Sequence, residues 1–102
     1  MLESVFQSKL IKEIEERFPG SIVTKVESYI QGFPDLLVLY EDRWAMLECK
    51  RNRNAKHQPN QDDYVEKLDG MSFSRFIYPE NKEEVLNDLQ QAFGARREAC
   101  SS

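Results

Sequence analysis

Two apolar runs of strand length, separated by a short polar break, constrain the fold of this chain more than any other feature. They span residues 35–40 and residues 44–50. The charged residues of both runs, Asp35, Glu48 and Lys50, stand at the same end of the pair once the chain doubles back. Charged side chains are rarely buried in strands unless they are paired or bind a metal. The pattern therefore predicts a β-hairpin that carries a polar site at its open end.

The length of the hairpin turn decides whether these charged side chains meet. A turn of two or four residues centred on Glu41 and Asp42 places Asp35 opposite Glu48, and strand alternation puts Lys50 on the same face. An odd-length turn would send one carboxylate to the other face. With an even turn, the opposite face carries the residues that we expect to form the core: Leu36, Val38, Ala45, Leu47 and Cys49.

The three charged residues suit one kind of chemistry. Two carboxylates supply the oxygen ligands that Mg²⁺ and Mn²⁺ prefer, and the Cys49 carbonyl between Glu48 and Lys50 is a candidate further ligand. Such a cation polarises a phosphate oxygen and lowers the pKa of a bound water. The Lys50 ammonium can orient that water and stabilise negative charge at phosphorus. The pattern therefore favours phosphodiester hydrolysis, with a turn cap at Asp35 and a simple Glu48–Lys50 ion pair as the alternatives.

Three amphipathic segments are predicted to be helices. Their apolar residues recur at three- and four-residue spacing, which places one face of each helix against a core. We expect Trp44 and Met46, on the same hairpin face as Asp35, to pack under the first helix. The segments cover about residues 2–18, 60–70 and 81–93, and Gly94 is expected to end the last of them.

The remaining strand signals complete one sheet. Residues 21–30 mix β-branched and polar residues, as expected of an edge strand, and residues 73–78 have the pattern of a short strand. The predicted order is αβββαβα, an α/β fold with a central mixed four-stranded sheet flanked by helices. We expect a single domain over residues 1–94 and a disordered tail over residues 95–102.

Charge is unevenly distributed along the chain. The net charge is −4, yet residues 43–57 hold five Lys or Arg residues against a single Glu. A basic segment directly after the predicted site suits an anionic substrate, whereas a solvated loop is the alternative. The candidates for contacts with backbone phosphates are Arg51, Arg53, Lys56 and His57.

Other classes of protein are disfavoured by the composition. No run approaches the roughly 20 apolar residues of a membrane span, and the first residues do not have the pattern of a signal peptide. The two cysteines, Cys49 and Cys100, have no Cys or His at zinc-site spacing, and a disulfide framework is not expected. A cytoplasmic protein is therefore expected.

The hairpin residues resemble a known signature. Pro34-Asp35 followed by Glu48-Cys49-Lys50 is similar to the motif of the PD-(D/E)XK nucleases, and the inferred αβββαβ order is the core of that superfamily. Further residues resemble its VRR-NUC branch, so that the resemblance covers about residues 3–78. These are Glu3 with Gln7, the segment from Gly32 to Leu36, and Gln61 with Leu68 and Gly70 behind it.

The resemblance implies a restriction-endonuclease-like fold and a Mg²⁺-dependent DNA endonuclease, with Mn²⁺ as a substitute. The implied catalytic residues are Asp35, Glu48, Lys50 and Gln61, and the implied metal ligands are Asp35, Glu48, the Cys49 carbonyl and Glu3.

Stand-alone, virus-type members of this branch are homodimers that cut branched DNA. We therefore expect a homodimer acting on four-way junctions or flaps, in a phage-infected or bacterial cytoplasm, with residues 73–93 apolar enough to supply the interface. Two other readings stay open. One is a non-catalytic DNA-binding or protein-interaction module with the nuclease fold, and the other is an unrelated α/β protein that binds no metal.

Overall fold

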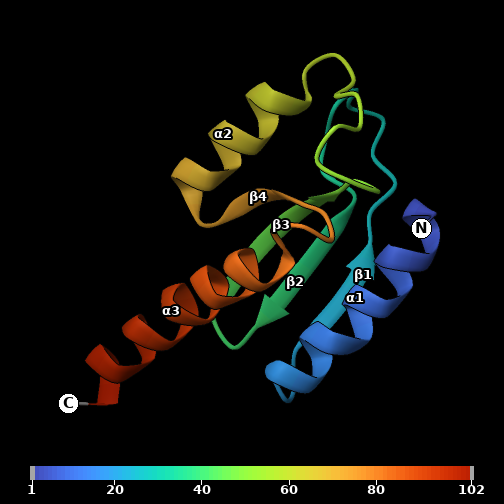
Figure 1. Ribbon diagram of the computed structural model, residues 1–102. Coiled ribbons are helices and arrows are strands. Elements are labelled where there is room, and N and C mark those ends of the chain that lie inside the picture. Colours follow the sequence, from blue (N-terminus) through green and yellow to red (C-terminus); the bar gives the residue numbers. More distant parts are fainter. Residues whose placement is uncertain (1, 102) are drawn as a thin grey trace.

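The computed structural model describes residues 2–101, with side chains described over residues 2–94 (Figure 1). Its element order is the predicted one, a helix, three strands, a helix, a strand and a helix. The elements are α1 (Glu3–Arg17), β1 (Ile22–Lys25), β2 (Leu36–Tyr40), β3 (Arg43–Cys49), α2 (Gln61–Met71), β4 (Ser74–Ile77) and α3 (Lys82–Ser101).

The strands form one four-stranded sheet in the order β1-β2-β3-β4. The first three strands are antiparallel and β4 runs parallel to β3, which confirms the mixed sheet and the edge position of β1. The prediction that residues 21–30 form one strand was wrong, because β1 ends at Lys25. Beyond it, the Ile30 N–H bonds the Ser28 hydroxyl and the Phe33 N–H bonds the Ile30 carbonyl. These local bonds replace strand pairing and form a loop over residues 26–35.

The β2–β3 hairpin has a two-residue turn. Tyr40 pairs with Arg43 across the turn formed by Glu41 and Asp42, and Glu41 has a φ of 55°. Positive φ in a two-residue turn matches the twist of the adjoining strands. This even turn confirms the predicted register, whose last strand pair is Leu36 with Leu47. The next residues outward are Asp35 and Glu48.

One face of the sheet carries the main core. α1 and α3 both pack on this face, and the aromatic rings of Phe18, Tyr40 and Phe93 meet there with centroids 5.3–5.7 Å apart. The hairpin residues predicted for the core are all in it. Buried core residues from the sheet and the two helices include Phe6, Leu10, Ile14, Leu36, Val38, Ala45, Leu47, Cys49, Ile77, Leu86 and Leu89.

The opposite face of the sheet is covered by α2. Met46 is buried there, outside the cluster that contains α1, and the Ser72 hydroxyl at the end of α2 donates to the Trp44 carbonyl. The expectation that Trp44 and Met46 pack under the first helix was therefore wrong. Strand alternation places residues on one face or the other, but it does not say which helix covers each face.

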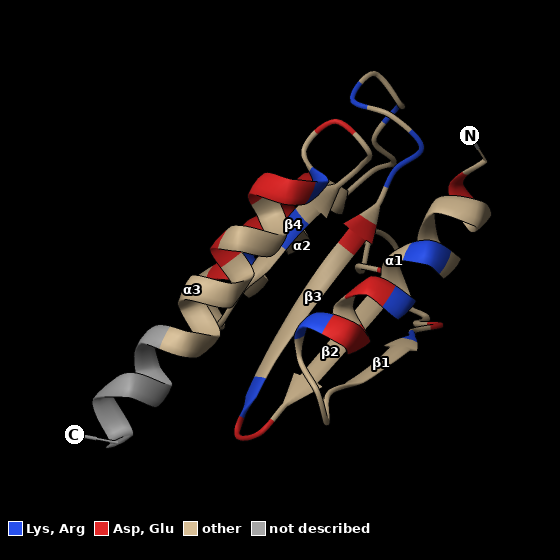
Figure 2. Cartoon of the chain, turned by 60° about the horizontal axis from the view of Figure 1, so that its bottom comes forward, with Lys and Arg blue, Asp and Glu red and all other residues tan. Residues whose placement is uncertain are grey.

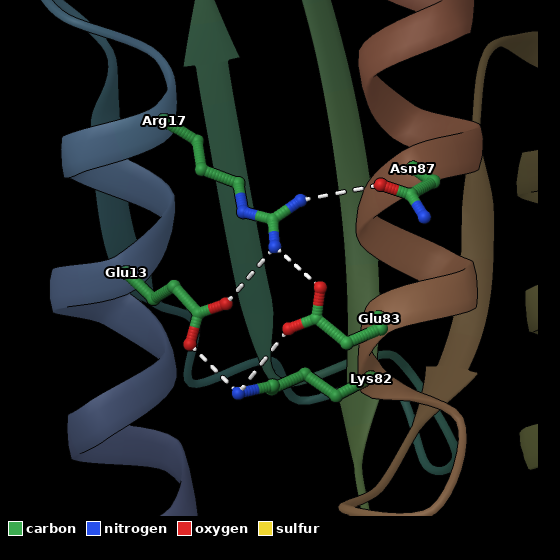
Figure 3. Close-up of polar contacts among 5 residues, drawn as sticks. All are labelled: Glu13, Arg17, Lys82, Glu83 and Asn87. Atoms are coloured by element: carbon green, nitrogen blue, oxygen red, sulfur yellow. Dashed lines mark hydrogen bonds and ion pairs between the residues drawn. The ribbon is translucent and has the colours of Figure 1, made fainter.

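An ion-pair network joins α1 to α3 on the outside of the core (Figure 3). Arg17 lies 2.6 Å from Glu83 and 3.4 Å from Glu13, and Lys82 lies 2.8 Å from Glu13 and 3.7 Å from Glu83. Arg17 also reaches the Asn87 side chain at 3.5 Å. Partly exposed pairs of this kind each contribute little to stability. They connect Glu13 and Arg17 of α1 to Lys82 and Glu83 of α3, and the first turn of α1 borders the site described below.

α3 continues past the position at which its end was predicted. It runs to Ser101, and Gly94 does not have the positive φ of a left-handed helix cap. The Arg43 guanidinium donates to the Ala92 and Phe93 carbonyls and so fastens this part of α3 to the hairpin turn. The side chains of residues 95–102 lie outside the described part of the chain, so the tail expected there stays a prediction. Within the described residues, no helix is both long and apolar enough to cross a membrane.

Candidate active site

The open end of the hairpin brings the two carboxylates together. Asp35 immediately precedes β2 and Glu48 lies near the end of β3, opposite it in the hairpin register. The Asp35 Oδ1 accepts a hydrogen bond from the Cys49 N–H at 3.1 Å. Glu48 is only 4% exposed, although a glutamate side chain in water is charged at neutral pH. The sequence prediction that both side chains share one site is thus consistent with their placement.

Burial makes ionisation of both carboxyl groups unfavourable. Burial raises the pKa of Glu48 to about 8; the charge of Asp35 raises it too, whereas Lys50 opposes the rise. Burial also raises the pKa of Asp35, and the hydrogen bond from Cys49 offsets part of that effect. Two close carboxylates out of water repel each other, and a bound cation would relieve that repulsion.

Lys50 is held in place by groups from the loop after β3 and from α2. Its side chain is buried, at 5% exposure. The Nζ donates to the Gln61 Oε1 at 2.7 Å and to the Lys56 carbonyl at 3.1 Å, and it lies 4.0 Å from the Glu48 Oε2. The Gln61 Oε1 also accepts from the Gln58 N–H at 2.8 Å. The ammonium is therefore fixed beside the Glu48 carboxylate, and Gln61 is the side chain that links it to α2.

The turn before Asp35 packs against the start of α2. Gly32 has a φ of +90°, and a Cβ there would lie 2.7 Å from the Pro59 carbonyl oxygen and from the backbone carbon of Asn60. One residue later, the Phe33 ring meets the Tyr64 ring with centroids 5.9 Å apart. Only glycine fits both the backbone angle and the close approach. This contact sets the position of Asp35 relative to the first turn of α2.

An open pocket of about 530 Å³ lies at this end of the molecule. It joins Glu48 and Lys50 to the first turn of α1, so Glu3 lies in the same pocket, and the Glu3 charge also raises the pKa of Glu48. Among residues with described side chains, no three His, Cys, Asp or Glu residues form a ready cluster for a metal ion. The pocket is lined by Leu2, Glu3, Glu48, Lys50, Arg51, Ala55, Lys56, Gln58 and Gln61.

The basic loop between β3 and α2 stands beside this pocket (Figure 2). Arg51 and Lys56 line the pocket, as their predicted role in phosphate contacts requires. Arg53 is exposed, and its backbone N–H is bonded to the Glu80 carboxylate at 3.3 Å, which ties the loop to the segment after β4. The loop is therefore fastened at its middle while its arginines remain on the surface.

His57 is an exposed loop residue, as expected, and its side chain also makes contacts within the chain. Its Nδ1 lies 2.7 Å from the Asp62 Oδ1, and its ring stacks on Phe76 with centroids 4.0 Å apart. These contacts anchor the loop between the sheet and α2. No pattern in the sequence predicts the contact of His57 with Phe76, because it depends on the parallel pairing of β4 with β3. The backbone partners of Lys50 and Gln61 were missed for a similar reason, since any residue type can supply a carbonyl or an N–H.

Comparison with known proteins places this geometry in a family. No family sequence model and no curated protein matches the chain. A solved structure described as a VRR_NUC domain is 31% identical, with a TM-score of 0.59 over 74% of this chain and 82% of that one. The chain belongs to the VRR-NUC family. Because VRR-NUC domains are a branch of the PD-(D/E)XK nucleases, the resemblance inferred from sequence is confirmed and a nuclease is indicated.

The VRR-NUC site has a donor set that fits a divalent metal ion. Nucleases of the PD-(D/E)XK superfamily typically use divalent metals. In this chain Asp35 and Glu48 offer hard oxygen ligands, and burial raises the pKa of both carboxyl groups, an effect that a bound cation would oppose. The Cys49 carbonyl follows Glu48 directly and can complete the set with water. Glu3, exposed at the pocket edge, is the remaining candidate ligand.

The raised pKa of Glu48 predicts how the metal-free VRR-NUC chain responds to pH. The unfolded chain ionises Glu48 near its ordinary pKa of 4.5, but the folded chain ionises it only near a pKa of about 8. The folded state therefore loses stability relative to the unfolded state as pH rises from about 4.5 to about 8. Glu48→Gln removes this penalty. In EDTA, we expect its melting temperature to exceed that of the wild type by an amount that grows from pH 5 to pH 8.

Thermal unfolding at several pH values measures this difference, with Mg²⁺ as the control condition. Added Mg²⁺ should raise the melting temperature of the wild type most at pH 8 and should have little effect on Glu48→Gln. A difference between the two proteins that stays constant from pH 5 to pH 8 would contradict the assignment of this penalty to Glu48.

Proposed function

We propose that this chain is a metal-dependent DNA endonuclease that hydrolyses phosphodiester bonds in branched DNA. The observation that carries the proposal is the buried Lys50 ammonium, held by Gln61 and the Lys56 carbonyl beside Glu48 at the floor of an open pocket. If a buried lysine served only stability, all three of its N–H groups would be expected to form hydrogen bonds within the fold. Here the ammonium lies 4.0 Å from the Glu48 carboxylate, whose ionisation is itself disfavoured by burial and by the charge of Asp35.

Asp35, Glu48 and the Cys49 carbonyl would hold Mg²⁺ or Mn²⁺, with Glu3 as an additional ligand. When bound, the ion supplies Lewis-acid polarisation of a phosphate oxygen and a lowered pKa for a bound water. The Lys50 Nζ has three N–H groups, and two of them are used by Gln61 and Lys56. The third is available to orient the attacking water and to stabilise negative charge on the phosphorus oxygens. Gln61 serves by holding Lys50 in that orientation.

The basic loop after β3 supports a nucleic acid as the substrate. Arg51, Arg53, Lys56 and His57 lie in this loop, and Arg51 and Lys56 border the pocket. Lys and Arg side chains that follow a phosphate backbone give affinity and register without reading the base sequence. A site that contacts DNA mainly through its phosphates selects DNA by its shape, which suits branched molecules such as four-way junctions and flaps.

A homodimer is part of the proposal, because one chain offers one site and paired incisions across a junction need two. Most of the apolar side chains of residues 73–93 are buried in the core of the single chain, whereas Phe76 is partly exposed and Ala92 is exposed. Exposed apolar residues also occur at Ile22 on the edge strand β1 and at its partner Leu39 on the neighbouring strand β2. Light scattering on the purified protein measures whether two copies associate.

A panel of DNA substrates tests the proposed activity. Four-way junction, flap, single-stranded and linear duplex DNA are incubated with the protein in Mg²⁺ and in Mn²⁺. We expect cleavage of the branched molecules at least about 10-fold faster than cleavage of the linear duplex, because the short basic loop gives little grip on an unbranched duplex. Binding of branched DNA without cleavage in either metal would instead favour a non-catalytic module with the nuclease fold.

A further inference from the structure

The loop of residues 26–35 carries an aromatic side chain that the proposed chemistry does not use. Tyr29 is 98% exposed, so its ring makes almost no contact with the rest of the described chain. Leu2 and Val5, at the start of α1, are also exposed, and Leu2 already lines the pocket. A fully exposed tyrosine does not contribute to core packing, and its ring is free to pack against a ligand.

The loop that presents Tyr29 is tied down on both sides of it. The Val26 N–H bonds the Asp35 carbonyl at 2.9 Å and closes the base of the loop. Within the loop, the Ile30 N–H bonds the Ser28 hydroxyl at 3.0 Å, so the residues on either side of Tyr29 are joined. The loop that carries Tyr29 therefore has a backbone conformation that is defined by hydrogen bonds.

The base of this loop is the candidate active site itself. Val26 is bonded to Asp35, and Tyr29 follows Val26 by three residues. Three residues span at most about 11 Å of backbone, so the Tyr29 Cα lies within about that distance of the Val26 Cα, whose N–H is bonded to Asp35. Successive nucleotides of one DNA strand rise about 3.4 Å, so this reach corresponds to about three nucleotides. A DNA strand held at Asp35 can therefore extend to the loop that carries Tyr29 within a few nucleotides.

The charges around Tyr29 favour a base over a phosphate as its partner. The loop of residues 26–34 contains no Lys or Arg, and Glu27 adds a negative charge to it. Phosphate contacts instead belong to the basic loop on the neighbouring side of the site, which the Gly32 turn touches at Pro59 and Asn60 (Figure 1). Aromatic rings stack on any nucleobase through its π-face, but only when that base is unpaired and unstacked.

We propose that Tyr29 is a stacking platform for an unpaired nucleobase close to the scissile phosphate. This inference rests on the proposed nuclease function and adds a source of selectivity to it. A linear duplex presents no unpaired base to the ring, whereas a flap presents several next to the branch point. Tyr29 then favours cleavage at the boundary between paired and unpaired DNA.

The test uses flap DNA with 2-aminopurine at the first three unpaired nucleotides, bound in Ca²⁺ instead of Mg²⁺. Stacking on Tyr29 should quench its fluorescence with the wild type and with Tyr29→Phe, but not with Tyr29→Ala. We expect Tyr29→Ala to bind the flap about 5- to 150-fold more weakly, equivalent to about 1–3 kcal/mol per stacked base, and to bind linear duplex unchanged. Met71→Ala, which removes a 65% exposed apolar side chain on α2, is the matched control and should behave as the wild type.

Cleavage kinetics in Mg²⁺ distinguish stacking from a structural role. Stacking predicts a higher KM on the flap with kcat retained, and recovery of the wild-type KM in Tyr29→Phe. Three results would overturn the inference: equal flap binding by Tyr29→Ala, an equal loss on linear duplex, or a change of oligomeric state that makes Tyr29 a subunit contact. If the wild type cuts no DNA in Mg²⁺ or Mn²⁺, the proposed nuclease function fails, while the fluorescence assay still reports whether Tyr29 stacks on a base.

Discussion

Lys50→Met is expected to reduce the single-turnover rate of DNA cleavage by at least about 100- to 1,000-fold, the usual cost of losing one preorganised donor at developing charge. Methionine has a similar length but no N–H, so the third donor of Lys50 is lost while the pocket stays filled. DNA affinity should change little, because the contacts with DNA phosphates come from the exposed basic loop. Cleavage under saturating enzyme, with binding measured separately, checks both parts of this expectation.

The control for Lys50→Met is Lys12→Met, which removes a lysine from the exposed side of α1. It should cut at the wild-type rate. Lys50→Met leaves the Lys56 carbonyl without that donor, and Gln61 keeps its bond from the Gln58 N–H. We therefore expect a loss of about 1–3 kcal/mol in unfolding free energy, which a thermal melt can verify. A folded Lys50→Met protein that cuts within about threefold of the wild type would remove Lys50 from the mechanism.

Gly32→Ala is expected to lower the free energy of unfolding by about 3 kcal/mol or more. The positive φ alone costs a non-glycine residue about 1–2 kcal/mol. The added Cβ would also lie 2.7 Å from backbone atoms of Pro59 and Asn60, so one of the two segments must move. Because that contact sets Asp35 against α2, cleavage should fall together with stability. Denaturant unfolding and the cleavage rate measure the two effects.

Gly20→Ala provides a matched control for this substitution. Gly20 has the same φ of +90°, but a Cβ there meets nothing within 4 Å. It should therefore show the conformational cost alone, about 1–2 kcal/mol, and an unchanged cleavage rate. The difference between the two variants isolates the contact between the Gly32 turn and the start of α2. Equal destabilisation by both substitutions would show that this contact is not under steric constraint.

The hairpin could be predicted from sequence because its information is local. The alternation of residues 35–40 and 44–50, together with a two-residue turn, is enough to set the register that pairs Leu36 with Leu47. The length of β1 could not be predicted, because Ser28 competes for backbone bonds that a strand would use. The helix over Met46 could not be predicted either, since the side of the sheet that each helix covers depends on the path of the whole chain.

The residues of the candidate site also divide into those that local sequence patterns reveal and those that such patterns do not reveal. Asp35, Glu48 and Lys50 were predicted because charged residues at the end of apolar strands are unusual and therefore informative. The Lys56 carbonyl and the Gln58 N–H, which hold Lys50 and Gln61, carry no signal in the sequence. His57 was predicted as a candidate for phosphate contacts, but its stacking on Phe76 was not foreseen, because it depends on the parallel pairing of β3 and β4. Long-range backbone contacts are thus the part of the site that residue patterns do not reveal.

The central claim is that Asp35, Glu48 and Lys50 form a metal-dependent phosphodiesterase site. The most direct measurement is the single-turnover cleavage rate of the wild type and of Glu48→Gln, in Mg²⁺ and in EDTA, on the DNA that the wild type cuts fastest. We predict cleavage by the wild type in Mg²⁺, none in EDTA, and a rate at least about 100-fold lower for a folded Glu48→Gln protein. Equal cleavage by Glu48→Gln, or wild-type cleavage that persists in EDTA, would contradict the claim.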